Sequence, residues 1–143
     1  MRVMVIVKAT VDSENEGDQM DMVKHADMFE AMGKYNEELI AAGIMLAGDG
    51  LKPSRFGKRI HFDGKKRGIT DGPFAETKEL VAGYWVWQVR SMEEAVEWAK
   101  RCPNPMPGPS DLEIRPFWEP EDFGPAAEAE VRAYQAKLGK SAH

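Results

Sequence analysis

Two runs of this chain are apolar on both faces of an extended strand, and they restrict the fold more than any other feature. Residues 3–7 read VMVIV, and residues 81–90 read VAGYWVWQVR, with Trp85 and Trp87 on one face and Tyr84 and Val86 on the other. A strand with two apolar faces is covered on both sides. We therefore expect both runs to lie in one sheet that carries protein on each face.

The rest of the chain predicts helices and further strands around these two runs. Residues 20–42 carry apolar side chains at steps of three or four, which predicts a helix that ends at Gly43 and whose stripe is interrupted by Asn36. Ser91 and Glu94 form a capping box, which predicts a second helix that ends before Pro103. The other expected elements are a polar loop at 9–19, strands at 44–51 and 112–118, and a helix at 125–138.

A basic hairpin interrupts the middle of the chain. Asp63-Gly64 is a hairpin turn signal between residues 58–62 and 66–70, and the lysines and arginines around it predict that the hairpin is exposed. Residues 71–80 follow as a turn and a helical turn. Without the hairpin and the last helix, the order of elements is βαββαβ, which predicts an α+β, ferredoxin-like fold with helices on one face of the sheet.

The other face of such a sheet stays open in a single copy. Because the strands are apolar on both faces, we expect the sheet of an identical subunit to cover it, giving a homodimer. No linker divides the chain, so we expect one domain at residues 1–119 and a helical extension at residues 120–143 that clasps the partner subunit.

Charge and composition argue against several classes of protein. The 143 residues carry a net charge of -5 without a basic stripe, which argues against nucleic-acid binding. No apolar run approaches the roughly 20 residues that span a bilayer, and residues 1–7 are too short for a signal peptide. The single cysteine, Cys102, suits a reducing compartment. We expect a cytoplasmic protein that does not associate with membranes.

Residues 71–79 (DGPFAETKE, the DGPF segment below) resemble the signature of the DGPF proteins, a branch of the YCII-related family. Further likeness lies in residues 39–43, 48–51, 82–84, 94–99 and 113–116, so the resemblance covers roughly residues 1–119. It implies a ferredoxin-like protomer that dimerises sheet to sheet into an α+β barrel. It also implies an association of some members with extracytoplasmic-function sigma factors. Wider relatives carry a histidine and an aspartate proposed as a catalytic pair, but Met32 or Gly33 stands near the place of that histidine here.

The DGPF segment has two interpretations. In the functional one it is a polar lid over a pocket at the barrel mouth, where Asp71 or Glu76 acts as acid or base and Lys78 neutralises a carboxylate. In the structural one it is a turn that satisfies its own polar groups and positions Phe74 in the core. Arg115, in the last strand, would either hold an anion or form a structural ion pair.

Three classes of function remain open. The first is a protein that binds a small molecule, an anion included, in a pocket that uses Tyr84, Gln88, Arg115 and Lys78. The second is a cofactor-free isomerase, lyase or oxygenase that uses a carboxylate of the DGPF segment. The third is an interaction module acting with a sigma factor, for which the methionine-rich first helix would serve as packing or as a partner surface. No spacing of histidine, cysteine and carboxylate residues matches a zinc site, and we expect neither a metal nor a cofactor.

Overall fold

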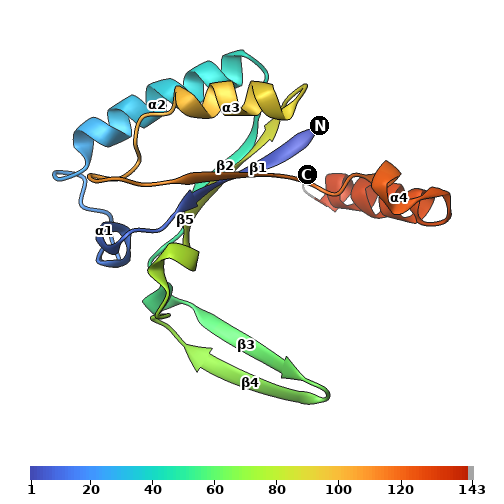
Figure 1. Ribbon diagram of the computed structural model, residues 1–143, viewed down its shortest axis with the longest axis horizontal. Helices are drawn as coiled ribbons and strands as arrows, with labels where there is room; N and C mark the ends of the chain where they lie inside the picture. The colour runs from blue at the N-terminus through green and yellow to red at the C-terminus, as the bar shows by residue number, and fades with distance from the viewer. Residues whose placement is uncertain (142–143) are drawn as a thin grey trace.

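The centre of the computed structural model, which describes residues 1–141, is a four-stranded antiparallel sheet (Figure 1). Its strands are β1 (Arg2–Lys8), β2 (Met45–Gly50), β5 (Val81–Gln88) and β6 (Leu112–Pro116). They lie in the order β2-β5-β1-β6, and every neighbouring pair is antiparallel. The helices α2 (Ala26–Ala41) and α3 (Met92–Lys100) lie on one side of this sheet. This order confirms the predicted α+β, ferredoxin-like arrangement.

The remaining elements lie outside this centre. The hairpin of β3 (Lys58–Asp63) and β4 (Lys66–Asp71) forms a sheet of its own and projects from the body (Figure 1). The short helices are α1 (Val11–Glu14), η1 (Ser54–Phe56), η2 (Thr77–Glu79) and η3 (Pro120–Phe123), and α4 (Pro125–Ser141) follows η3. Residues 142–143, the end of the predicted extension, lie outside the described residues. None of the helices within residues 1–141 is long and apolar enough to cross a membrane.

The core lies between the sheet and its two helices. Val3, Val5 and Val7 of β1 and Trp85 and Trp87 of β5 are buried there, together with Tyr35 and Leu39 of α2. The alternate side chains of the same strands, Met4, Ile6, Tyr84 and Val86, are half-buried on the opposite face. The alternation confirms the predicted apolar pattern of both faces. In one copy only the first face is fully covered.

Three local predictions were wrong. Residues 9–19 contain α1 rather than only a loop, because Thr10 and Ser13 cap each other: Thr10 N donates to Ser13 Oγ at 2.9 Å and Ser13 N to Thr10 Oγ1 at 3.4 Å. The helix expected from residue 20 begins at Ala26, because the Asp21 carboxylate holds a separate turn before it. The capping box expected at Ser91 and Glu94 is incomplete. The Glu94 carboxylate accepts a hydrogen bond from Arg90 N at 3.3 Å instead of from Ser91 N.

The packing of α2 on α3 predicts that alkali destabilises the protein. Tyr35 donates its hydroxyl to Trp98 O at 2.6 Å, and burial raises the pKa of Tyr35 above its ordinary value, with a further contribution from the nearby Cys102 thiol. Burial also raises the pKa of Cys102 to about 11. The folded chain therefore keeps protons that the unfolded chain has lost, and its stability falls as pH rises from about 9 to 11. Urea midpoints measured from pH 7 to 11 will show this fall.

A Cys102→Ala variant separates the two groups. It removes the thiol contribution, so the decline in its urea midpoint between pH 9 and 10 is expected to be smaller than in the unmodified chain. A midpoint that stays constant from pH 8 to 11 in the unmodified chain would contradict the prediction.

Candidate functional site

A cavity of about 280 Å³ lies between α2 and the strands β2 and β5. The loop before α2 and the Pro105-Met106 loop add to its wall. Its lining is mainly apolar and includes Phe29 and Trp85. Methionine is the most frequent residue in it: the methionines of the wall are Met20, Met28, Met32, Met45 and Met106. Methionine side chains are flexible and polarisable, so this wall can adapt to the shape of a bound molecule.

Asn36 is the polar side chain that α2 places in this wall. Trp85 Nε1 donates to Asn36 Oδ1 at 2.9 Å. An indole N–H can only donate, so the amide oxygen must face the tryptophan and the amide nitrogen must face away from it. Asn36 Nδ2 makes no hydrogen bond with the described residues. The cavity therefore has a hydrogen-bond donor whose orientation is fixed by Trp85.

Trp85 is held firmly enough to orient Asn36. Its ring lies edge-on to Tyr35, with 6.1 Å between centroids, and 5.9 Å from the ring of Trp87. On the neighbouring strand, Gly48 leaves room for this ring, because a Cβ at Gly48 would lie 2.8 Å from Trp85 Cδ1. The packing of β2 on β5 thus fixes the indole, and the indole fixes the amide.

Asp49 and Tyr84 border the cavity, but their side chains lie on the face of the sheet opposite Trp85. They lie opposite each other on β2 and β5, and the Tyr84 hydroxyl donates to Asp49 Oδ2 at a long 3.5 Å. Asp49 is exposed, and the residues that line the cavity include no lysine or arginine. The wall on the Trp85 face of the sheet therefore holds no charged side chain.

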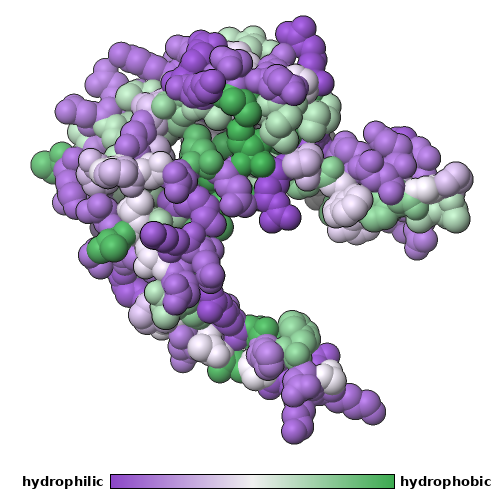
Figure 2. Space-filling view, viewed as in Figure 1, coloured by the Kyte–Doolittle hydropathy of each residue, from purple (hydrophilic) through white to green (hydrophobic). Residues whose placement is uncertain are grey.

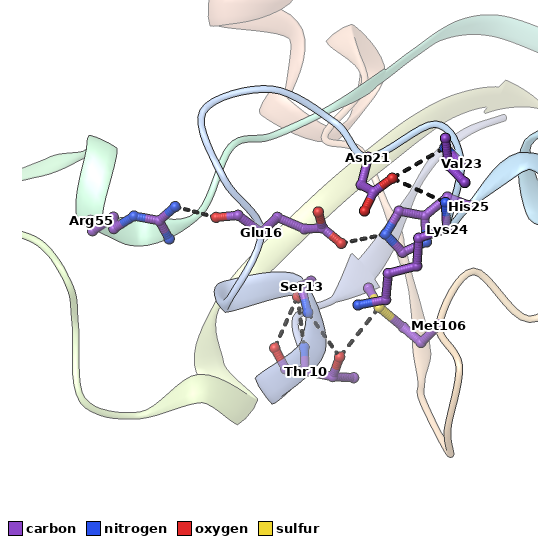
Figure 3. Close-up of polar contacts among 9 residues, drawn as sticks. All are labelled: Thr10, Ser13, Glu16, Asp21, Val23, Lys24, His25, Arg55 and Met106. Carbon is purple, nitrogen blue, oxygen red and sulfur yellow. Dashed lines mark hydrogen bonds and ion pairs between the residues drawn. The ribbon is translucent and has the colours of Figure 1, made fainter.

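A polar network holds the loop before α2 in place (Figure 3). The Glu16 carboxylate pairs with the His25 ring, and Glu16 O accepts from the Arg55 guanidinium of η1. Beside it, Thr10 Oγ1 donates to Met106 Sδ at 3.3 Å. These contacts position the two loops that contribute methionines to the wall. Among residues 1–141 no three histidine, cysteine, aspartate or glutamate side chains gather where they could hold a metal ion.

Three of the predicted site residues lie in or beside the DGPF segment, away from this cavity. Asp71 ends β4 and forms an exposed ion pair with Lys58. Glu76 and Lys78 are exposed at η2. The cavity wall contains none of the three.

The other three predicted residues are divided between two places. Tyr84 borders the cavity, with its side chain on the face of β5 opposite Trp85. Gln88 is exposed at the end of β5, where its amide donates to Met1 O at 3.1 Å. Arg115 lies on β6 opposite Met4 of β1 and is exposed. It forms no ion pair with any of residues 1–141, so the structural ion pair, one of its two interpretations, is absent among these residues. The structure does not bring the six residues together into one site.

The DGPF segment is joined to the loop at η1. Phe74 N donates to Ser54 Oγ at 3.1 Å, and Ser54 in turn donates from N and Oγ to the Glu14 carboxylate at 3.0 and 2.5 Å. The Phe74 ring lies 3.9 Å from the Arg59 guanidinium and borders a wide depression of about 540 Å³. It is not part of the core, so the prediction that Phe74 fills the core was wrong.

Two known proteins show partial likeness to this chain. An uncharacterized protein of Rhizobium meliloti (strain 1021) is 40% identical over 49 residues, which make up 34% of this chain and 40% of that protein. The chain thus matches well under two thirds of the length of this relative. The solved structure of a 5-chloro-2-hydroxyhydroquinone dehydrochlorinase from Burkholderia phenoliruptrix AC1100, in complex with 2,5-dihydroxybenzoquinone, aligns with a TM-score of 0.45 and 14% identity. The alignment covers 83% of this chain and 95% of that one.

The match to a protein family is far more extensive. The model of the YCII-related domain matches residues 1–118, which include the whole four-stranded sheet, both helices that cover it and the hairpin. The match ends just before η3 and α4. The chain therefore belongs to the family of YCII-related domains.

Proposed function

We propose that this protein binds a small, neutral and largely apolar organic molecule in the methionine-lined cavity. The observation that carries the proposal is the Asn36 amide, which Trp85 turns so that its NH₂ group is free to donate. A donor with a fixed direction inside an apolar wall is typical of sites that orient a ligand.

The size and lining of the cavity favour a single-ring molecule. A volume of about 280 Å³ is close to the lower limit of about 300 Å³ for ligand pockets. Thioether sulfurs make favourable contacts with aromatic rings, so the five methionines suit an unsaturated ring. Asn36 Nδ2 would donate to a carbonyl or hydroxyl oxygen of the ligand.

The absence of lysine and arginine from the lining favours a neutral ligand over the anion that the sequence left open. A carboxylate buried in the cavity would need a paired cation, and the wall supplies no lysine or arginine. Asp71 and Glu76 lie outside the wall of the cavity, so we assign no proton transfer to them. The Asp71-Gly72-Pro73-Phe74 motif supports placing the chain in the DGPF branch of its family.

Calorimetric titration with 4-hydroxybenzamide, a neutral ring with a hydroxyl and a carbonyl, tests this function. Binding is expected, and benzoate, an anion of similar size, is expected to bind at least tenfold more weakly. Met32→Trp should fill the cavity and weaken the binding of 4-hydroxybenzamide at least tenfold. The matched control is Met22→Trp, because Met22 is exposed in the turn before α2 and does not line the cavity.

The thermal midpoint of each unliganded variant shows that it is folded. A ligand at 100 times its dissociation constant stabilises a protein by about 2.7 kcal/mol, which shifts the midpoint of a chain of this size by several degrees. Equal weakening by Met22→Trp and Met32→Trp, or tighter binding of benzoate than of the neutral amide, would refute the proposal.

A further inference from the structure

The hairpin β3–β4 is an exposed element with one apolar face. All twelve residues of its two strands are exposed. The register pairs Ile60 with Ile69 and Phe62 with Arg67, which puts these four side chains on the same face. Phe62 is 67% exposed and Ile69 is 70% exposed. An isolated two-stranded hairpin is marginally stable in water, so this apolar face needs a partner.

The segment from Trp118 through α4, named the arm here, is a second such element. It follows β6 and is tethered to the body at Glu119, whose carboxylate accepts from the Arg2 guanidinium at 2.7 Å. Trp118 is 74% exposed and Tyr134 is 62% exposed. Beyond this tether α4 packs mainly on η3. Most of the stability of a helix in a protein comes from packing, so the exposed apolar side chains of the arm also need a partner.

The hairpin and the arm carry opposite charge. Residues 58–71 hold five lysines and arginines against two aspartates. Residues 119–130 hold five carboxylates and no lysine or arginine. Some of these charges are paired within the chain, but Lys65, Lys66 and Glu130 form no ion pair with the described residues. Opposite potentials of this kind steer and align two docking surfaces.

The two elements do not meet within one copy. The hairpin extends on the side of the sheet away from α2 and α3, and α4 projects separately from the body (Figure 1). Figure 2 shows the molecule hollowed between them. The complementary surfaces of one chain are therefore held apart, and each is accessible to another molecule.

We propose that a second copy of this chain docks its basic hairpin against the acidic arm of the first. A two-fold axis makes the contact reciprocal, because each copy supplies both surfaces, and the assembly then closes as a dimer. The apolar faces at Phe62 and Tyr134 meet inside the contact, and the lysines of the hairpin tip lie against the carboxylates of residues 119–130. This contact does not depend on a ligand in the cavity.

Disulfide trapping between two separately tagged chains tests the contact. Both chains carry Cys102→Ser; one carries Phe62→Cys and the other Tyr134→Cys. Mild oxidation of the mixture is expected to give the covalent heterodimer at least tenfold faster than a mixture of Phe62→Cys with Lys34→Cys. Lys34 is the matched control, because it is exposed on α2, in the helix layer. Equal rates in both mixtures, or no heterodimer, would overturn the proposal.

Charge reversal provides a second measurement. Lys65→Glu with Lys66→Glu is expected to raise the dissociation constant of the dimer about tenfold or more in sedimentation. Adding Glu121→Lys and Glu130→Lys to the same chain is expected to restore the original dissociation constant. A chain that had lost its fold would show no such rescue. A chain that sediments as a monomer at 100 µM, or a reversal without rescue, would overturn the proposal.

Discussion

Replacement of Gly72 by alanine is expected to destabilise the protein by on the order of 3 kcal/mol, at the upper end of what overpacking costs. A Cβ at Gly72 would lie 1.7 Å from Ser54 O and 2.5 Å from Ser54 C. Both atoms belong to the backbone, so no side-chain rotation relieves the clash. The chain at η1 must move away, and the hydrogen bonds from Phe74 to Ser54 and from Ser54 to Glu14 are then disrupted.

Gly68→Ala is the matched control, in the strand β4 that ends just before Gly72. The nearest atom to a Cβ at Gly68 is His61 Cβ at 3.7 Å, an ordinary van der Waals distance. This variant is expected to stay within about 0.5 kcal/mol of the unmodified chain, as surface substitutions do. Urea denaturation measures the global effect, and limited proteolysis of residues 52–74 measures a local one. Indistinguishable results for the two variants would show that the close approach at Gly72 is unimportant.

The Gly72 contact bears on the two interpretations of the DGPF segment. The segment joins β4 to the loop at η1 through Gly72 and Phe74, and Asp71 is ion-paired at its surface. These contacts support a structural role, although the segment does not place Phe74 in the core as that interpretation expected. A single sequence shows which turn such residues favour, but not which distant loop they will touch.

The sheet could be predicted because its signals are local. Alternation along residues 3–7 and 81–90 identifies two strands that must be covered, and the βαββαβ order leaves few ways to arrange them. The signals at the helix starts were weaker. The Asp21 carboxylate accepts from nearby backbone N–H groups in a turn, just as an aspartate does when it caps a helix. The first residue of α2 therefore could not be located from composition alone.

The cavity could not be predicted because its wall is assembled from distant segments. The methionines in it come from the loop before α2, from α2, from β2 and from the Pro105-Met106 loop, and each of them also suits ordinary packing. Asn36 was the available signal, since a polar residue interrupts the apolar stripe of its helix at that position. Its meaning depends on Trp85, which is 49 residues away in sequence. The association with a sigma factor stays a prediction.

Replacement of Leu39 by alanine is expected to cost about 2–5 kcal/mol of unfolding free energy, the range for large-to-small changes in a well-packed core. Leu39 is fully buried between α2 and the sheet. Its backbone carbonyl also accepts from Ile44 N at 2.9 Å, so the residue lies where α2 turns into β2 and the neighbouring chain has little freedom to fill the void. Since domains of this kind are stable by only about 5–15 kcal/mol, the loss is a large share of the total.

Ile40→Ala is the matched control, because Ile40 is the next residue of the same helix and is 61% exposed. Both changes slightly raise the helix propensity, so propensity cannot explain a difference between them. Ile40→Ala is expected to change the free energy of unfolding by no more than about 0.5 kcal/mol. Leu39 also anchors α2 one turn beyond Asn36, so Leu39→Ala should weaken binding of 4-hydroxybenzamide at temperatures where the variant is still folded. Urea denaturation of both variants, with equal m-values, measures the difference in stability. Equal midpoints would show that Leu39 does not anchor α2 on the sheet.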